Sequence, residues 1–335
     1  MTQLIQAPNL SLQDEQALLD LYTRGTPENT LRAYERDLLY IEAWKGAPLS
    51  WPESEEIALR FILDHARDLE ADDTARRTAE SLIAKGLRKS LKCPAPATLD
   101  RRIASWAAFH RMRNLTSPFE APLLRQARAK ARRAAARPPA PKSNNPITLD
   151  VLERLLTACD PSLRGTRDRA ILMLGWASGG RRRSEITGLH VEDLTFDSDL
   201  IHIRLLETKT TAKGTTPKLL LKGRAAQAIK DWLHAAHLTT GPLFRPISKS
   251  GTVLSRPLHP DAIRQILKRL LVMAGYPATF ASPHGLRSGF LTEAALKGTP
   301  LQAAMRLSLH RSAAQAQKYY DDVELKDNPA TDLLG

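Results

Sequence analysis

Residues 282–289 read SPHGLRSG, and the rest of the second half of the chain is best understood around this stretch. Ser282 can cap a helix whose first position is Pro283, so His284 and Arg287 project together from its first turn. Backbone N–H groups and the helix dipole favour an anion there, Arg287 adds a forked cation, and an imidazole exchanges a proton near neutral pH. The stretch therefore predicts an anion-binding helix start, with a histidine satisfied inside a helix cap as the plainer alternative.

A second basic element lies upstream at residues 179–189, GGRRRSEITGL. Arg182 and Glu185 stand three residues apart, so they lie on the same side of a helix that begins after Gly180. Such an arginine can bind two phosphate oxygens while the glutamate holds the local structure. Taken alone, the pair fits a surface ion pair equally well.

A lysine follows the predicted strand at 200–205. Lys209 lies in ETKT, at the mouth of a hairpin, where a long ammonium side chain could reach a leaving oxygen as a general acid. Lys213 and Lys218 are rivals for that role, and a loop lysine is ordinarily just solvated.

The last element is SLHRSAAQAQKYYDD at 308–322, in which His310 precedes a short helix that ends in Tyr319 and Tyr320. Adjacent side chains on a helix point in different directions, so one tyrosine at most faces a shared phosphate. A phenol has a pKa near 10 and attacks poorly unless cations and a base assist it.

Periodicity predicts helices in the first half and a mixture of helices and strands in the second. The first-half helices are expected at about 26–44, 54–62, 73–91 and 98–110. The second half predicts strands at 200–205 and 218–221, and helices at 148–156, 224–237, 260–275, 283–297, 300–307 and 312–320.

A basic stretch rich in alanine, residues 123–137, runs into a segment with prolines at 138, 139, 141 and 146. Proline breaks helices, so we expect a helical unit at 1–137, a linker at 138–147, a mixed unit at 148–322 and a tail at 323–335. His110 is expected in the core of the first unit. The candidate DNA-binding residues of this unit are Arg101, Arg102, Arg125, Arg128, Lys130, Arg132, Arg133 and Arg137. Solvated helix faces and an ordinary linker would look much the same.

Composition limits which binding partner and which cellular compartment we expect. The 335 residues carry a formal net charge of +13, which favours a polyanion such as DNA. Cys93 and Cys159 show neither disulfide nor metal-site spacing, and the chain has no export signal or apolar span long enough for a bilayer. We therefore expect a cytoplasmic protein without a membrane partner.

Together these elements resemble the tyrosine recombinases, or phage integrases. The likeness covers residues 148–320 and extends more loosely to TPENTLRAYERDL at 26–38. It implies a mainly α fold with a small β-sheet, in which a helical core-binding domain precedes a mixed α+β catalytic domain.

The resemblance also implies a role for each site residue. Tyr319 attacks the scissile phosphate to give a 3′-phosphotyrosine and a free 5′-hydroxyl, and a Holliday junction follows. Arg182 and Arg287 stabilise the transition state, and Glu185 supports the site. Lys209 protonates the departing 5′ oxygen, His284 assists proton transfer at the tyrosine, and His310 donates a hydrogen bond to the phosphate.

The family implies double-stranded recombination sites, a tetramer on two duplexes, an accessory or directionality protein, and no metal, ATP or other cofactor. The tail is implied to dock on a neighbouring protomer. The sequence departs from the pattern in three ways: Leu309 replaces a common glycine, Arg181 and Arg183 flank Arg182, and Tyr320 leaves a second candidate nucleophile.

Three other functions fit parts of the pattern. A type IB topoisomerase uses a similar residue set but relaxes DNA as a monomer. A non-catalytic DNA-binding regulator could keep the same scaffold, although no expected active-site residue type is missing. A metal-dependent nuclease is disfavoured because the sequence lacks suitably spaced acidic or His/Asp ligands.

Overall fold

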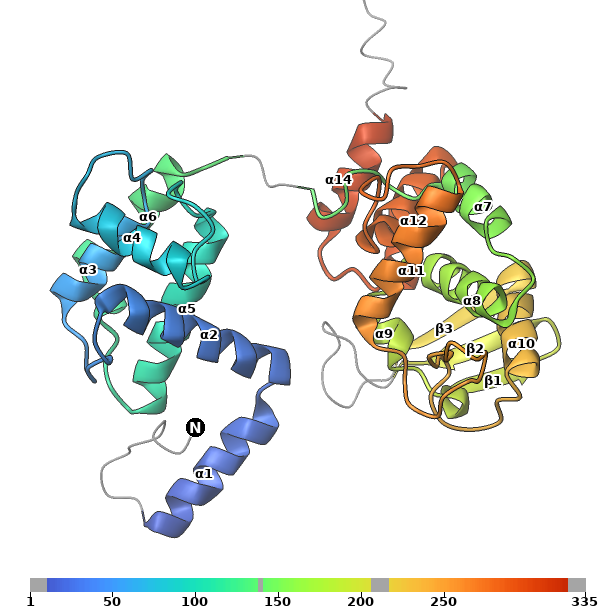
Figure 1. The fold of residues 1–335 in the computed structure, drawn as a ribbon, viewed down its shortest axis with the longest axis horizontal. Helices are drawn as coiled ribbons and strands as arrows, with labels where there is room; N and C mark the ends of the chain where they lie inside the picture. Colours follow the sequence, from blue (N-terminus) through green and yellow to red (C-terminus); the bar gives the residue numbers. More distant parts are fainter. Residues whose placement is uncertain (1–10, 138–140, 206–216, 325–335) are drawn as a thin grey trace, which may run out of the picture. The chain divides into compact units, whose positions relative to one another are not determined.

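The computed structural model describes residues 11–137, 141–205 and 217–324, and the chain forms two compact units, residues 1–139 and 140–335 (Figure 1). Lys209, Lys213 and residues 325–335 of the expected tail lie outside the described residues. The described part is mainly helical with one small sheet, which confirms the predicted fold class. None of its helices is both long and apolar enough to cross a membrane.

The described residues of the first unit form helices joined by loops, with no strand. Its core gathers fully buried aromatic and aliphatic side chains, with Trp106 and Phe61 in edge-to-face contact at 5.6 Å between ring centroids. His110 is buried among them, as expected, and its Nδ1 lies 3.0 Å from the carbonyl of Trp106. The helices are α1 (Leu12–Gly25), α2 (Glu28–Lys45), α3 (Glu55–Asp64), α4 (Thr74–Ala84), α5 (Pro96–Met112), the 3-10 turn η1 (Pro118–Glu120) and α6 (Pro122–Ala134).

Two features of this unit differ from the expectation. Helix α1 was not predicted; it begins after the cap residue Ser11, whose side chain accepts from the N–H of Asp14, and none of its side chains is buried. The helix expected at 73–91 ends at Ala84, since Gly86 adopts the left-handed conformation (φ 69°) and turns the chain.

The second unit combines helices with a three-stranded antiparallel sheet of order β1-β2-β3. Strands β2 (Leu200–Arg204) and β3 (Lys218–Lys222) correspond to the predicted pair, with Ile201 opposite Leu221. Strand β1 (Leu194–Asp197) was missed because it is short and exposes three of its four residues. The helices are α7 (Leu149–Thr157), α8 (Leu163–Ala177), α9 (Arg183–Thr187), the 3-10 turn η2 (Val191–Asp193), α10 (Gly223–Ala235), α11 (Pro260–Met273), α12 (His284–Leu296), α13 (Leu301–Ser308) and α14 (Ala313–Glu324).

Helix α8 is the centre of the second core. It packs against α10 and α12, and Ile171 and Leu174 are fully buried in it (Figure 1). Residues 170–177 of this helix, AILMLGWA, are a nearly uniform apolar run. We did not predict α8 from the sequence, because such a run shows no helical period.

Close backbone contacts bring the basic segments together. A Cβ at Gly180 would lie 2.1 Å from the Cα of Arg287, so the turn before α9 needs glycine to approach α12. The segment before α7 also crosses α12: the N–H of Ile147 donates to the carbonyl of Gly285 over 2.9 Å, and a Cβ at Gly289 would lie 1.8 Å from the Ile147 oxygen. The start of α12 is thus fixed from two sides.

Candidate active site

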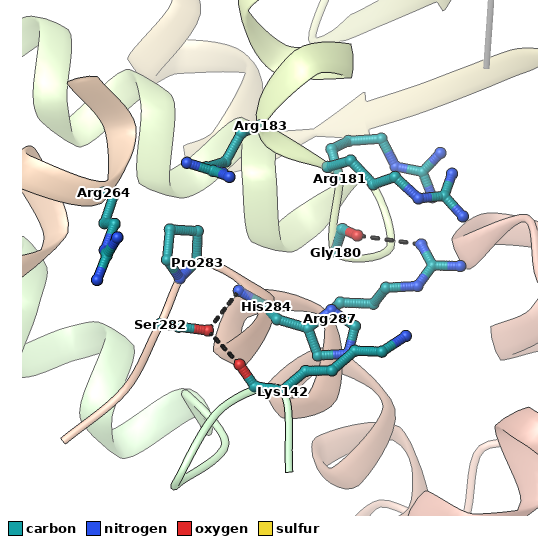
Figure 2. A pocket seen from close by; sticks show the side chains of 10 residues that line it. Lys142, Gly180, Arg181, Arg183, Arg264, Ser282, Pro283, His284 and Arg287 are labelled. Carbon is teal, nitrogen blue, oxygen red and sulfur yellow. Dashed lines mark hydrogen bonds between the residues drawn. The ribbon is translucent and has the colours of Figure 1, made fainter. Parts of the chain in front are cut away.

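A basic pocket of about 390 Å³ opens where the turn before α9 meets the start of α12 (Figure 2). Five arginines and a lysine contribute to its wall, and Figure 2 shows side chains arriving from different elements. The lining residues are Lys142, Gly180, Arg181, Arg182, Arg183, Arg264, Ser282, Pro283, His284 and Arg287.

His284 and Tyr319 meet at this site from α12 and α14. The Nε2 of His284 lies 3.2 Å from the Oη of Tyr319. Burial lowers the pKa of His284 to about 4, and the charges of Lys142, Arg287 and Arg182 act in the same direction. Burial raises the pKa of Tyr319, partly opposed by Arg287. At neutral pH a neutral imidazole therefore faces a neutral phenol, and the phenol O–H can donate to Nε2.

Arg287 and His310 form the second contact of the site. Guanidinium Nε lies 3.2 Å from His310 Nε2, and Nη1 donates to the carbonyl of Gly180 over 3.1 Å. The hydroxyl of Ser308 lies 2.8 Å from His310 Nδ1. Burial, followed by the charge of Arg287, lowers the pKa of His310 to about 4. Nη2 of Arg287 also lies 3.1 Å from His310 Nδ1. A neutral ring has a single acceptor nitrogen, so it can accept from Arg287 at only one of its two nitrogens.

The three consecutive arginines before α9 occupy three different environments. Arg182 is the cap residue of α9, its side chain is 31% exposed, and its Nη1 lies 2.5 Å from Glu185 Oε1. Arg183 pairs with Asp261 of α11, and Arg181 is buried. The expected contact between Arg182 and Glu185 is present, although α9 begins at Arg183, two residues later than predicted.

The start of α12 differs from the expected anion site in one respect. Pro283 precedes the first helical residue, and the Oγ of Ser282 accepts from the N–H of His284 over 3.2 Å. The N–H groups of Gly285 and Leu286 also donate within the chain. These amides are already satisfied, so anion binding here depends on side-chain cations rather than on free backbone N–H groups.

The adjacent tyrosines separate as expected for neighbours on a helix. Tyr320 is 4% exposed, packs with Leu291 and Ala304, and donates its hydroxyl to the carbonyl of Thr299 over 3.0 Å. Tyr319 is the tyrosine whose hydroxyl lies beside His284.

The candidate DNA-binding residues of the first unit differ in their partners and in their exposure. Arg101 pairs with Asp37, Arg128 and Arg132 lie near Asp100, and Arg137 donates to the carbonyl of Cys93. The structure does not place Arg102 on the surface: it is 9% exposed, with its guanidinium 3.2 Å from the ring centroid of Tyr40, so its burial corrects that expectation.

Three of the predicted DNA-binding residues are exposed on α6 with no acidic partner among the described residues. We term them the α6 cations: Arg125, Lys130 and Arg133.

Two pocket residues were not predicted from the sequence. Lys142 lies in the expected linker, where its carbonyl accepts from Ser282 Oγ over 2.8 Å, and Figure 2 shows its side chain on the same side of the pocket as His284. Arg264 projects from α11, a helix for which the sequence suggested no site. Neither belongs to a local motif, so only the tertiary contact reveals them. The described residues hold no group of three or more His, Cys, Asp or Glu side chains arranged for a metal ion.

Known proteins share both the sequence pattern and the fold. Over 318 residues the chain is 29% identical to an integrase/recombinase xerD homolog of Selenomonas ruminantium, which covers 91% of this chain and 85% of that protein. It is 26% identical over 310 residues to tyrosine recombinase XerD of Listeria innocua, which covers 90% and 91%.

Solved structures show the same fold at lower identity. The Tn1549 transposon integrase in complex with circular intermediate DNA superposes with a TM-score of 0.57 at 18% identity, over 92% of this chain and 96% of that one. A lambda integrase dimer bound to a COC′ core site gives 0.54 at 16% identity, over 94% and 78%.

The family assignment rests on a direct match of the second unit. Residues 145–325, more than half of the 335, match the phage integrase family model. The chain therefore belongs to the phage integrase family of site-specific recombinases.

Proposed function

We propose that this recombinase cleaves one DNA strand by attack of the Tyr319 oxygen on the scissile phosphate. The observation that carries the proposal is the 3.2 Å approach of Tyr319 Oη to His284 Nε2 beside the arginine-lined pocket. A phenol becomes an effective nucleophile when a neutral base takes its proton as the new bond forms. His284 is neutral at pH 7 and is positioned to do so.

The step balances without an external energy source. The Tyr319 oxygen forms a bond to phosphorus, its proton passes to His284 Nε2, and the bond from phosphorus to the 5′ oxygen breaks. The 5′ oxygen takes a proton, a role that the family resemblance assigns to Lys209. In the reverse step a 5′-hydroxyl of another strand attacks the 3′-phosphotyrosine and the phenol regains its proton, so rejoining consumes no ATP.

Arginines stabilise the charge that develops on the phosphate. Arg182 is partly exposed to the pocket, and Arg287 is fixed by its contacts with Gly180 and His310. Fixed guanidinium groups in a poorly solvated pocket stabilise an oxyanion more strongly than mobile ones in water. The family resemblance assigns His310 a hydrogen bond to the phosphate. Donating it from Nε2 requires the tautomer whose Nδ1 accepts from the hydroxyl of Ser308, 2.8 Å away.

The α6 cations and the assembly complete the proposal. We place the α6 cations on the DNA backbone, because exposed cations without an acidic partner gain most from replacing phosphate counterions. Exchange between two duplexes through a Holliday junction in a tetramer, with the C-terminal tail on a neighbouring protomer and an accessory protein setting direction, follows from the family and is part of the proposal.

A nicked suicide substrate tests the chemistry. DNA that flanks the gene is incubated with wild type, Tyr319→Phe and Tyr320→Phe, and detergent-resistant adducts are measured. We expect an adduct through the 3′ phosphate that is lost only in Tyr319→Phe, which still binds DNA. An adduct that persists in Tyr319→Phe would refute the choice of nucleophile. Adducts on plasmids of any sequence would instead favour a topoisomerase. DNA binding without any adduct would favour a non-catalytic regulator.

A further inference from the structure

Arg181 is a buried cation for which the proposed chemistry has no use. Its side chain is 1% exposed, and its Nη2 donates to the carbonyl of Leu307 over 2.8 Å. Its Nη1 lies 3.6 Å from Glu185, which already pairs with Arg182 at 2.5 Å. Within the described residues, its Nε and Nη1 are shielded from solvent and have no hydrogen-bond partner.

These atoms are unsuited to direct phosphate binding. A phosphate oxygen must reach an N–H group, and the unpartnered nitrogens of Arg181 have essentially no accessible surface. Arg182 and Arg287 already supply guanidinium groups at the pocket. Burying a cation with incomplete pairing opposes folding, so stability alone does not account for an arginine at this position.

The carbonyl that Arg181 holds lies in the turn that presents His310. Helix α13 ends with Leu309 in the left-handed conformation, φ 55° and ψ 42°, and His310 follows directly. For a leucine this conformation is roughly tenfold or more less populated than for glycine, which has no Cβ to clash. A Cβ at Gly179 would lie 2.4 Å from the same Leu307 oxygen, so the turn before α9 presses directly on this point.

We propose that Arg181 is a positioning residue: its hydrogen bond to the Leu307 carbonyl keeps the strained Leu309 turn closed and thereby holds His310 against Arg287. The inference rests on the proposed function, since the purpose of the turn is to present His310 to the phosphate. Arg181 acts through the backbone and touches neither phosphate nor nucleophile.

Hydrogen exchange in the protein without DNA tests the contact independently of catalysis. In full-length Arg181→Met we expect the amides of Leu309 and His310 to exchange about tenfold faster, with those of α10 unchanged. The melting temperature should equal or exceed that of wild type, because methionine fills the site without a buried charge. Unchanged exchange of the turn amides would overturn the proposal. A matched control is Arg169→Met, which removes an arginine-to-carbonyl bond to Cys159 away from the pocket.

Single-turnover cleavage of the suicide substrate then tests the consequence for chemistry. Arg181→Met should cleave about tenfold more slowly at unchanged DNA affinity, whereas Arg181→Lys, which keeps a donor, should stay within about threefold of wild type. In a Leu309→Gly background the loss from Arg181→Met should shrink to threefold or less, because glycine closes the turn unaided. Equal losses in both backgrounds would overturn the proposal. If wild type forms no adduct, the proposed function fails, and hydrogen exchange alone decides whether Arg181 holds the turn.

Discussion

The pKa of His284 makes a quantitative prediction about how cleavage depends on pH. An ordinary imidazole with a pKa near 6.5 is about 3% neutral at pH 5, whereas one with a pKa of about 4 is about 90% neutral. The pKa is depressed, so the neutral base predominates above pH 4 and is lost as the pH falls through that value. We expect the rate at limiting protein, which reports the free enzyme, to change by less than about twofold between pH 7 and pH 5.

The assay follows covalent adduct on a nicked substrate at protein concentrations well below saturation, with DNA binding by Tyr319→Phe measured at each pH as the control. His284→Gln should slow cleavage by about a hundredfold or more, the usual contribution of a positioned base. If the cleavage rate of His284→Gln still falls at low pH, we attribute that fall to His310, whose pKa is also lowered to about 4. A fall in wild-type rate of about 25-fold from pH 7 to pH 5, at constant binding, is what an ordinary imidazole would give and would refute the reasoning.

Three further predictions concern cations of the two units. Lys142→Met should raise the pKa of His284, because Lys142 is the largest charge effect that lowers it, and NMR titration of the ring in the free protein checks the direction. Arg287→Ala should slow single-turnover cleavage by about a hundredfold or more while DNA affinity falls only modestly. A near-normal rate would show that Arg287 does not stabilise the transition state. Neutralising the α6 cations together should lower the slope of log affinity against log salt by up to about three, measured beside an Arg128→Gln control, and an unchanged slope would argue that α6 does not follow the DNA backbone.

Much of the site was predictable because its pieces are local. His284 and Arg287 lie three residues apart on one helix, and Arg182 and Glu185 have the same spacing, so the helical period alone places each pair on one face. Which segments meet is a tertiary property, and the family resemblance supplied that information where spacing could not.

What the sequence could not reveal depends on contacts between distant segments. The environments of Arg181, Arg182 and Arg183 differ because α12, α13 and α11 approach the same turn from different sides. Likewise, the position of Lys142 follows from the hydrogen bond of Ser282 to its carbonyl, 140 residues away in sequence. A prolyl linker pattern gives no sign that one of its residues lines a pocket.

The electrostatics of the pocket link phosphate binding to the chemistry of His284. In the free protein, nearby cations disfavour a charged imidazole. His284 is therefore neutral and can accept a hydrogen bond from the phenol, but its affinity for a proton is low. A phosphate in the pocket offsets those cations, and the negative charge that builds in the transition state offsets them further. The affinity of His284 for a proton therefore rises as the phenol gives its proton up. In the proposed mechanism this affinity would fall again when the phosphotyrosine is attacked and the phenol leaves, so the same histidine would serve cleavage as a base and rejoining as an acid.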